Sequence, residues 1–368
     1  MSFVLWLREL DCVKFQATPA VLMAIFSGRL GSRGLTLLHF RESTEVESLE
    51  DGSTTKEPDN ASEESSPSAS CRIFRPVMLV KVANMLHKNA RCRSRLTTDI
   101  RYPTLKKCMA KYRIDLPASK FPTSHESDDD REYLLNSPMQ HALSELARRS
   151  DASLQAFVEM VRGQTPDDYR SNKNLVPSVL KKLCKGYKRL NELLTIAQEG
   201  VEVRLRKEPP RQQFRPPNHG SSKERLNVLR KNLRKEQDAW RSLVLDSDLL
   251  EQWPEVIISP FGVVDKGGED ASVSGRTIHD LSYPEDDSIN DYTDPTSIIK
   301  PEYHHCDAVA SEILRAKREH PEVEVEIMAG NVASAFRNIS IHSNSVYLFA
   351  GQIEEENIII IELSAPFG

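Results

Sequence analysis

The chain has 368 residues, of which 39% are hydrophobic and 28% are charged, and its formal net charge is only −5. This length suggests two or three domains of about 100–200 residues each, and so small a net charge does not indicate any particular partner. No apolar run approaches the roughly 18–20 residues that span a bilayer, and Arg8, Glu9 and Asp11 interrupt any signal-peptide core. We therefore expect an intracellular protein, in the cytoplasm or the nucleus, without a membrane partner.

The N-terminal part of the chain divides by composition into three segments. Residues 1–40 match no pattern that we can assign, whereas residues 41–70 are acidic, rich in serine and interrupted by proline. Such a composition cannot bury enough apolar surface to fold, so we expect residues 41–70 to be a disordered linker. Residues 71–135 form a small basic unit of unknown type, which ends in an acidic break at residues 124–132.

Residues 136–214 are predicted to be mainly helical. Apolar side chains recur at helical spacing from Ser137 to Gly163 and again from Leu180 to Gln198. No repeat period is evident in the sequence, so a solenoid of stacked repeats is not favoured.

Positive charge is concentrated between Lys181 and Arg241, a region with 17 lysines and arginines against 7 acidic residues. Ser221 and Glu224 have the spacing of a capping box, which predicts a helix that begins there and ends near Arg241. One face of this helix is apolar, and five cations lie on the others: Arg225, Arg230, Lys231, Arg234 and Lys235. The helix is either an ordinary solvated amphipathic helix or one that binds a phosphate backbone, since polyanions favour clustered cations.

Beyond Leu250 the pattern changes from helices to strands and turns. Val256–Val264 is predicted to be a strand interrupted by Pro260, and Asp265–Gly275 a turn rich in glycine, serine and aspartate. Arg276–Leu281 is predicted to be the returning strand of a β-hairpin.

The last part of the chain is predicted to contain one helix and three strands. A polar loop from Tyr283 to Pro301 precedes a helix over Asp307–Glu319, which Pro321 terminates. The strands are predicted over residues 322–331, 346–350 and 357–363. The order of hairpin, helix and strands indicates the α+β fold class with an antiparallel sheet.

The six cysteines are scattered along the chain without a Cys-x-x-Cys pair. This spacing favours reduced thiols over a disulfide framework or a zinc site. His304, His305 and Cys306 are adjacent, but neighbouring side chains on a helix or strand point in different directions. We therefore predict no metal site there.

The predicted hairpin has a recognisable sequence. Ser259–Lys266 reads Ser-Pro-Phe-Gly-Val-Val-Asp-Lys, and Gly275–Ser282 reads Gly-Arg-Thr-Ile-His-Asp-Leu-Ser. Together they resemble the fingers hairpin of the reverse transcriptase family, in which a lysine and an arginine hold the triphosphate of the incoming nucleotide. The matching residues are Lys266 and Arg276, whose positive charge suits a triphosphate. Without the resemblance they are two ordinary charges at the end of a hairpin.

A second segment, Val325–Ile341, reads Val-Glu-Ile-Met-Ala-Gly-Asn-Val-Ala-Ser-Ala-Phe-Arg-Asn-Ile-Ser-Ile. It resembles the first catalytic motif of the same family, where a strand ends in an aspartate that helps hold two Mg²⁺ ions. Ala335 and Phe336 match the alanine and the bulky aromatic residue of that motif. In the family, the aromatic ring lies beneath the sugar and excludes a 2′-hydroxyl. Asn331 stands where the aspartate is expected.

Asn331 is the position at which the chain departs from the family. Its side chain is neutral, whereas Mg²⁺ prefers carboxylate ligands. Glu324 and Glu326 lie at odd offsets from Asn331, and such side chains point to the opposite face of a strand, so neither replaces the aspartate. The resemblance therefore implies Mg²⁺ as the cofactor of the parent family, with no ion bound productively here.

A third segment, Ile358–Gly368, ends in Ala-Pro-Phe-Gly and resembles the strand and turn that lead into the family's next motif. The later Tyr-x-Asp-Asp hairpin, which supplies further metal-binding carboxylates, is not found in this sequence. The resemblance covers residues 215–368 and implies a truncated reverse-transcriptase fingers and partial palm, preceded by the helical and partly disordered N-terminal region.

The resemblance implies a retrotransposon-derived reverse transcriptase fragment. Its parent family copies an RNA or DNA template–primer with deoxynucleoside triphosphates, and Asn331 predicts that this chain is catalytically inactive. Two alternatives stay open. One is an active polymerase whose remaining parts lie on other sequence. The other is a non-enzymatic nucleic-acid-binding or interaction protein that uses the basic region Lys181–Arg241.

Overall fold

The computed structural model describes residues 101–118, 121–126, 131–294, 296, 306–319, 321 and 336–366. The chain divides into two units, and all described residues except 306–319 and 321 belong to the first. The predicted N-terminal segment and acidic linker lie outside the described residues, as does the first part of the predicted basic unit.

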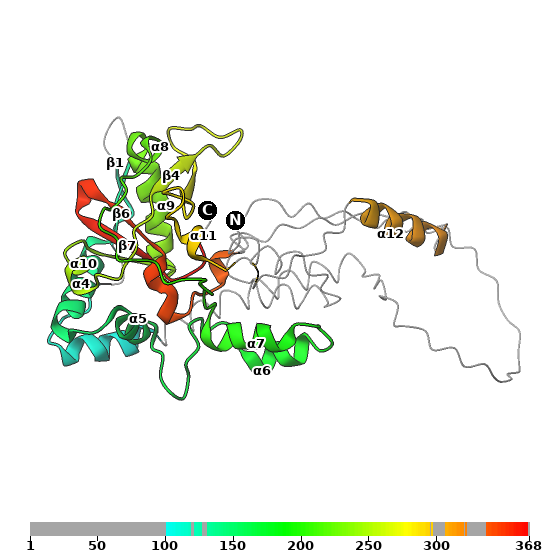
Figure 1. Ribbon diagram of the computed structural model, residues 1–368, viewed down its shortest axis with the longest axis horizontal. Coiled ribbons are helices and arrows are strands. Elements are labelled where there is room, and N and C mark those ends of the chain that lie inside the picture. Colours follow the sequence, from blue (N-terminus) through cyan, green and yellow to red (C-terminus); the bar gives the residue numbers. More distant parts are fainter. Residues whose placement is uncertain are drawn as a thin grey trace, which may run out of the picture. The chain divides into compact units, whose positions relative to one another are not determined.

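The first predicted helical stretch is confirmed as helical, but it is two helices (Figure 1). α4 spans Ser137–Ser150 and α5 spans Leu154–Arg162, and a further helix over residues 101–111 precedes them. Asp151 ends α4 in a left-handed conformation with φ 47°, and the side chain of Ser153 accepts a hydrogen bond at the start of α5. A left-handed residue followed by a capping serine stops one helix and starts the next.

The second predicted helical stretch also divides in two. α6 spans Pro177–Leu183 and α7 spans Leu190–Glu199. Gly186 lies between them at φ 88°, a conformation that glycine adopts without a steric penalty. Gly200 ends α7 at φ 95°, and a Cβ on it would lie 2.9 Å from the backbone nitrogen of His342. A residue larger than glycine at position 200 would therefore be strained.

The predicted capping box does not form, and the basic helix is shorter than expected. It begins at Gly220 and is divided into α8 (Gly220–Glu224) and α9 (Leu226–Asp238). The hydroxyl of Ser221 accepts a hydrogen bond of 3.2 Å from the backbone nitrogen of Val263 instead of one from its own helix. A contact with the distant hairpin thus replaces the local cap.

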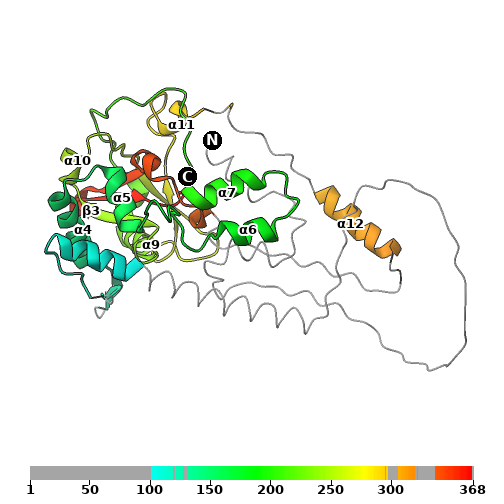
Figure 2. The same ribbon diagram turned by 90° about the horizontal axis from the view of Figure 1, so that it is seen from below.

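The main sheet of the first unit has three antiparallel strands in the order β3–β7–β6 (Figures 1 and 2). β3 spans Ser242–Asp246, β6 spans Ala350–Ile353 and β7 spans Ile358–Glu362. The antiparallel sheet and the α+β class are as predicted, and β7 matches the last predicted strand. β3 was not predicted.

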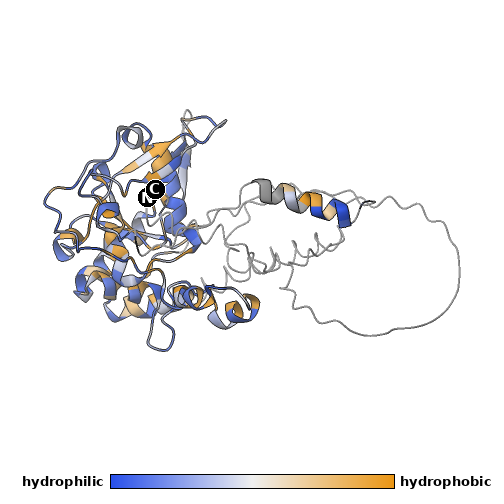
Figure 3. Ribbon diagram, turned by 45° about the vertical axis from the view of Figure 1, so that its right-hand side comes forward, coloured by the Kyte–Doolittle hydropathy of each residue, from blue (hydrophilic) through white to orange (hydrophobic). Residues whose placement is uncertain are grey.

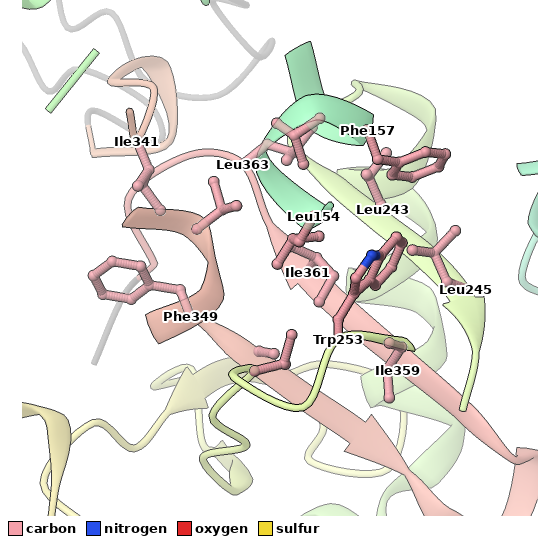
Figure 4. Close-up of a cluster of buried hydrophobic side chains, with 14 of the residues drawn as sticks. Leu154, Phe157, Leu243, Leu245, Trp253, Ile341, Phe349, Ile359, Ile361 and Leu363 are labelled. Carbon is pink, nitrogen blue, oxygen red and sulfur yellow. The ribbon is translucent and has the colours of Figure 1, made fainter. Parts of the chain in front are cut away.

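Both faces of this sheet are buried, and alternate residues of β7 face different clusters. Ile359 and Ile361 pack with Leu243, Leu245 and Trp253 and with side chains of α5 (Figure 4). Side chains of α4 belong to the same cluster. Their neighbours in the same strand pack against α9 on the other face. Successive side chains of a strand point to opposite faces, so a strand covered on both sides reads as a continuous run of isoleucines.

The predicted hairpin is confirmed, with shorter strands. β4 spans Phe261–Val264 and β5 spans Arg276–His279, and Val264 pairs with Arg276 at the end of the ladder next to the turn. The predicted extension back to Val256 is wrong, because that part makes only a single parallel bridge, between Ile258 and β6. A second small hairpin, β1 (Ser124–Glu126) with β2 (Arg131–Tyr133), was not predicted.

The predicted strand over residues 346–350 is wrong. Ser343–Leu348 is a 3₁₀ helix, η3, whose first turn is capped by His342, and β6 begins only at Ala350. The predicted strand over residues 322–331 lies outside the described residues. The shorter elements of the first unit are α10 (Leu249–Gln252), α11 (Ile289–Tyr292), η2 (Phe336–Asn338) and η4 (Glu354–Glu356).

In the second unit, α12 spans Cys306–Glu319, as predicted. It carries both hydrophobic and hydrophilic residues (Figure 3). Within the described parts of the chain, no helix combines the length and the apolar character needed to cross a membrane.

Candidate functional site

The second and third segments with a recognisable sequence lie side by side. Ser340 and Ser364 form an antiparallel bridge, and the backbone nitrogen of Ala365 donates a 2.9 Å hydrogen bond to the carbonyl of Ile339. The backbone nitrogen of Ile341 donates a 3.0 Å hydrogen bond to the carbonyl of Leu363. The residues that follow Phe336 are therefore aligned with those that follow β7.

Arg337, the residue after Phe336, joins the same two segments through its side chain. Its Nη2 lies 2.6 Å from Glu362 at the end of β7, and its Nε lies 2.9 Å from Glu236 of α9. Nη1 donates to the carbonyls of Ser364 and Ala365 at 3.1 and 3.3 Å. One guanidinium thus holds η2, β7, α9 and the segment that leads to Pro366.

The charges of this cluster compensate one another although all are largely buried. Burial alone would lower the pKa of Arg337, but Glu362 and Glu236 more than offset that effect and raise it. Burial acts to raise the pKa of Glu236, and Arg337 and Arg241 outweigh it, so that pKa is lowered. Arg241 binds Glu236 at 2.6 Å, and the hydroxyl of Ser242 donates to Glu362 at 2.6 Å. Two arginines and two glutamates therefore form a closed network.

This network was not predicted. Two signals in the sequence could have indicated it: the arginine directly after Phe336, and the single glutamate that ends the isoleucine run of β7. A glutamate on a fully buried strand requires a partner, because charged side chains are rarely buried unpaired. The sequence does not say which cation that partner is.

The base of the hairpin contacts the same sheet. The backbone nitrogen of Ser259 donates a 2.8 Å hydrogen bond to the carbonyl of Ala350, and His279 Nε2 lies 3.1 Å from the same oxygen. The ring of Phe261 lies against Gly351, where any Cβ would overlap it. The hairpin segment therefore contacts β6. β6 pairs with β7, the strand that leads into the third recognisable segment.

Lys266 and Arg276 lie together at the other end of the hairpin. Both are exposed; Lys266 lies in the turn, two residues after β4, and pairs with Glu269 at 2.8 Å, and Arg276 is the first residue of β5. The pair Val264–Arg276 is three residues along the ladder from Phe261–His279, a separation of about 10 Å. The two cations therefore extend away from β6 rather than contacting it.

Phe336 opens η2, is half-buried and packs against the main core. Asn331, the predicted metal position, and Ala335, the residue before Phe336, lie outside the described residues, so their contacts are not described. In the described part of the chain, no three His, Cys, Asp or Glu side chains converge as a metal site.

The five cations predicted on the basic helix differ in their surroundings. Arg234 is 5% exposed and donates to the carbonyls of residues 121, 122 and 134 at 2.7–3.0 Å, and it also pairs with Asp238. Arg230 pairs with Glu132 and Glu356.

The remaining three cations include Lys235, the exposed one of the five. Arg225 pairs with Asp265 at 2.9 Å, and Lys231 donates to the carbonyl of Val273 at 2.8 Å. Lys235 is exposed. Most of this positive charge is thus engaged in holding the two hairpins against α9.

No protein-family model, curated protein or solved structure matches this chain.

Proposed function

We propose that this chain derives from the reverse transcriptase of a retrotransposon and carries its fingers hairpin and part of its palm without catalysing nucleotide transfer. The observation that supports this most is the alignment of two segments that resemble neighbouring motifs of that family. They are joined by the Ala365–Ile339 hydrogen bond of 2.9 Å and the Arg337–Glu362 pair of 2.6 Å. Motifs that share a site must be adjacent in space, and the residues of these two contacts are 26 and 25 positions apart in the sequence.

Each matching residue has a role in this proposal. Lys266 and Arg276 hold the triphosphate of a deoxynucleotide, because both are exposed cations at the same end of one hairpin. Phe336 lies beneath the sugar, with Ala335 beside it. The RNA or DNA template–primer is the second partner, and the protein acts inside the cell.

The predicted donor set does not fit a productive Mg²⁺ pair. Asn331 offers a neutral amide oxygen where two-metal catalysis requires a carboxylate. No step of nucleotide transfer is therefore assigned to this chain, and the proposal is that of a nucleotide-binding relic.

Primer extension with the purified chain, Mg²⁺, a homopolymeric RNA template and a DNA primer tests this proposal. We expect no incorporation above background from the wild type. Asn331→Asp shows whether the substitution alone explains the inactivity. Template-dependent incorporation by the wild type would overturn the proposal.

A second candidate is nucleic-acid binding without nucleotide recognition. It is favoured by the exposure of Lys181, Lys182, Lys185 and Lys188 on α6 and the turn that follows it. Clustered lysines of this kind bind polyanions in a salt-dependent manner. Binding to an oligonucleotide that weakens steeply between low and moderate salt, and is lost when these four lysines are replaced by glutamine, would support it.

A further inference from the structure

A second group of cations, one of them buried, lies outside the Arg337 network. Arg162, the last residue of α5, is 3% exposed. Its Nη2 donates a 2.7 Å hydrogen bond to the carbonyl of Leu363, while its buried Nη1 has no hydrogen-bond partner among the described residues. A buried N–H of a charged group that lacks an acceptor costs free energy, so something is expected to accept from it.

Arg101 lies close to Arg162. The helix over residues 101–111 passes the end of α5, where Thr104 is 3.4 Å from the position of a Cβ on Gly163. Arg101 is three residues before Thr104 and so lies on the same face of its helix. Its guanidinium stacks 5.3 Å from the ring centre of Trp240, and its buried Nε has no partner in the described part of the chain.

The two guanidiniums influence one another. Burial lowers the pKa of Arg101 to about 10. Burial, followed by the positive charge of Arg101, lowers the pKa of Arg162 to about 9. The positive charge of Arg101 adds to the effect of burial on the pKa of Arg162, and Glu159 offsets the two only in part.

Two carboxylates near this group, Asp168 and Glu159, are engaged elsewhere. Asp168 pairs with Arg170 at 2.7 Å and with Lys173 at 3.1 Å. Glu159 accepts hydrogen bonds of 2.6 and 2.9 Å from Tyr169 and Ser343. Neither forms an ion pair with Arg162 or Arg101 within the described residues, so positive charge is in excess at this corner.

We propose that Arg162 and Arg101 form a binding site for a small phosphate-class oxyanion at the end of α5. Guanidinium N–H groups suit such an anion because they offer several charge-assisted hydrogen bonds in fixed directions. The burial of Arg162 limits the ligand to a small ion. The site is independent of the polymerase ancestry.

Inorganic phosphate is the probe that tests this site. The melting temperature of the full chain is followed as phosphate is titrated against sodium chloride of equal ionic strength, for the wild type, Arg162→Gln, Arg101→Gln and Arg148→Gln. Arg148 is the matched control, because its loss changes the net charge equally and it is an exposed arginine paired with Asp246 and Asp248. A ligand that binds only the folded state raises the melting temperature in a saturable manner.

We expect saturable stabilisation of the wild type and of Arg148→Gln, with affinity at least about tenfold weaker in Arg162→Gln and Arg101→Gln. If Arg162→Gln does not fold, Arg101→Gln decides the question, because Arg101 is only half-buried. An equal, non-saturating rise in all four proteins would show general salt stabilisation and overturn the proposal. Stabilisation by a short oligonucleotide but not by phosphate would overturn it as well.

Discussion

Arg337 Nη2 lies 2.6 Å from Glu362 Oε2, and this pair joins the turn after Phe336 to the end of the central strand. The exposed fractions of the two side chains are 11% and 6%. At this degree of burial the pair stabilises the fold only when both side chains are present, because removing one partner leaves the other charge buried alone. The alignment of the two recognisable segments therefore depends on both side chains.

Arg337→Ala should destabilise the protein by about 3–5 kcal/mol, since Glu362 and Glu236 then remain buried without their shared cation. Urea unfolding followed by far-UV circular dichroism measures this. Arg148→Ala, which breaks an exposed ion pair, should cost at most about 1 kcal/mol. Equal effects of the two substitutions would show that the Arg337 network does not stabilise the fold.

Stability should fall in acid through Glu236. Its pKa is lowered in the folded state from the ordinary value of 4.5, so below that value the unfolded state binds more protons. The contribution of Glu236 is present above its unfolded pKa and is lost as the pH falls through its folded pKa. The melting temperature measured from pH 7 to pH 3 should drop less steeply for Glu236→Gln, although that variant starts lower. Glu199→Gln, an exposed control, should follow the wild-type profile.

Gly351→Ala should destabilise the contact between the hairpin and β6. The added methyl overlaps the Phe261 ring, and overpacking of this kind costs about 1–3 kcal/mol. Gly267→Ala is the control, because a Cβ there has no atom within 4 Å. Phe261→Leu combined with Gly351→Ala should recover part of the loss in a double-mutant cycle. Strictly additive effects would mean that the ring and the glycine are not in contact.

Arg234 and Lys235 are adjacent on α9, and their replacement separates folding from nucleic-acid binding. Arg234→Ala should cost about 2–3 kcal/mol, because three backbone carbonyls lose a charged donor. Lys235→Ala should change stability by less than about 0.5 kcal/mol. Chemical unfolding and oligonucleotide binding are measured on both variants. If α9 binds a phosphate backbone, Lys235→Ala weakens oligonucleotide binding without loss of stability, and an unchanged affinity speaks against that interpretation.

The sequence predicted the elements whose signals are local. The isoleucine run of β7, the hairpin with its polar turn and the periodic helix α12 were all placed correctly. The predicted strand over residues 346–350 was wrong because buried Val346 and Leu348 alternate as they would in a strand, although they belong to a 3₁₀ helix. β3 was missed because only three residues separate its five residues from a long amphipathic helix, which was predicted to continue to Arg241.

The parts that could not be predicted depend on partners far apart in the chain. Ser221 does not form the expected capping box, and its hydroxyl instead accepts a hydrogen bond from the backbone nitrogen of Val263, 42 residues away. Glu362 and Glu236 both pair with Arg337, and these three residues come from distant parts of the chain. No spacing in the sequence therefore indicates the network. The exposed cations at the hairpin tip follow from the sequence, whereas the internal partners of Arg225, Arg230 and Arg234 do not.

Photolabelling with 8-azido-dATP tests most directly whether the aligned segments frame a nucleotide. We expect labelled peptides that contain Phe336 or residues 363–366, with labelling suppressed by excess dATP but not by deoxyadenosine. Lys266→Gln combined with Arg276→Gln should reduce the labelling at least about tenfold, because the triphosphate loses both cations. Labelling that excess dATP does not suppress, or that falls on α6 and α7 instead, would show that the aligned segments do not bind a nucleotide.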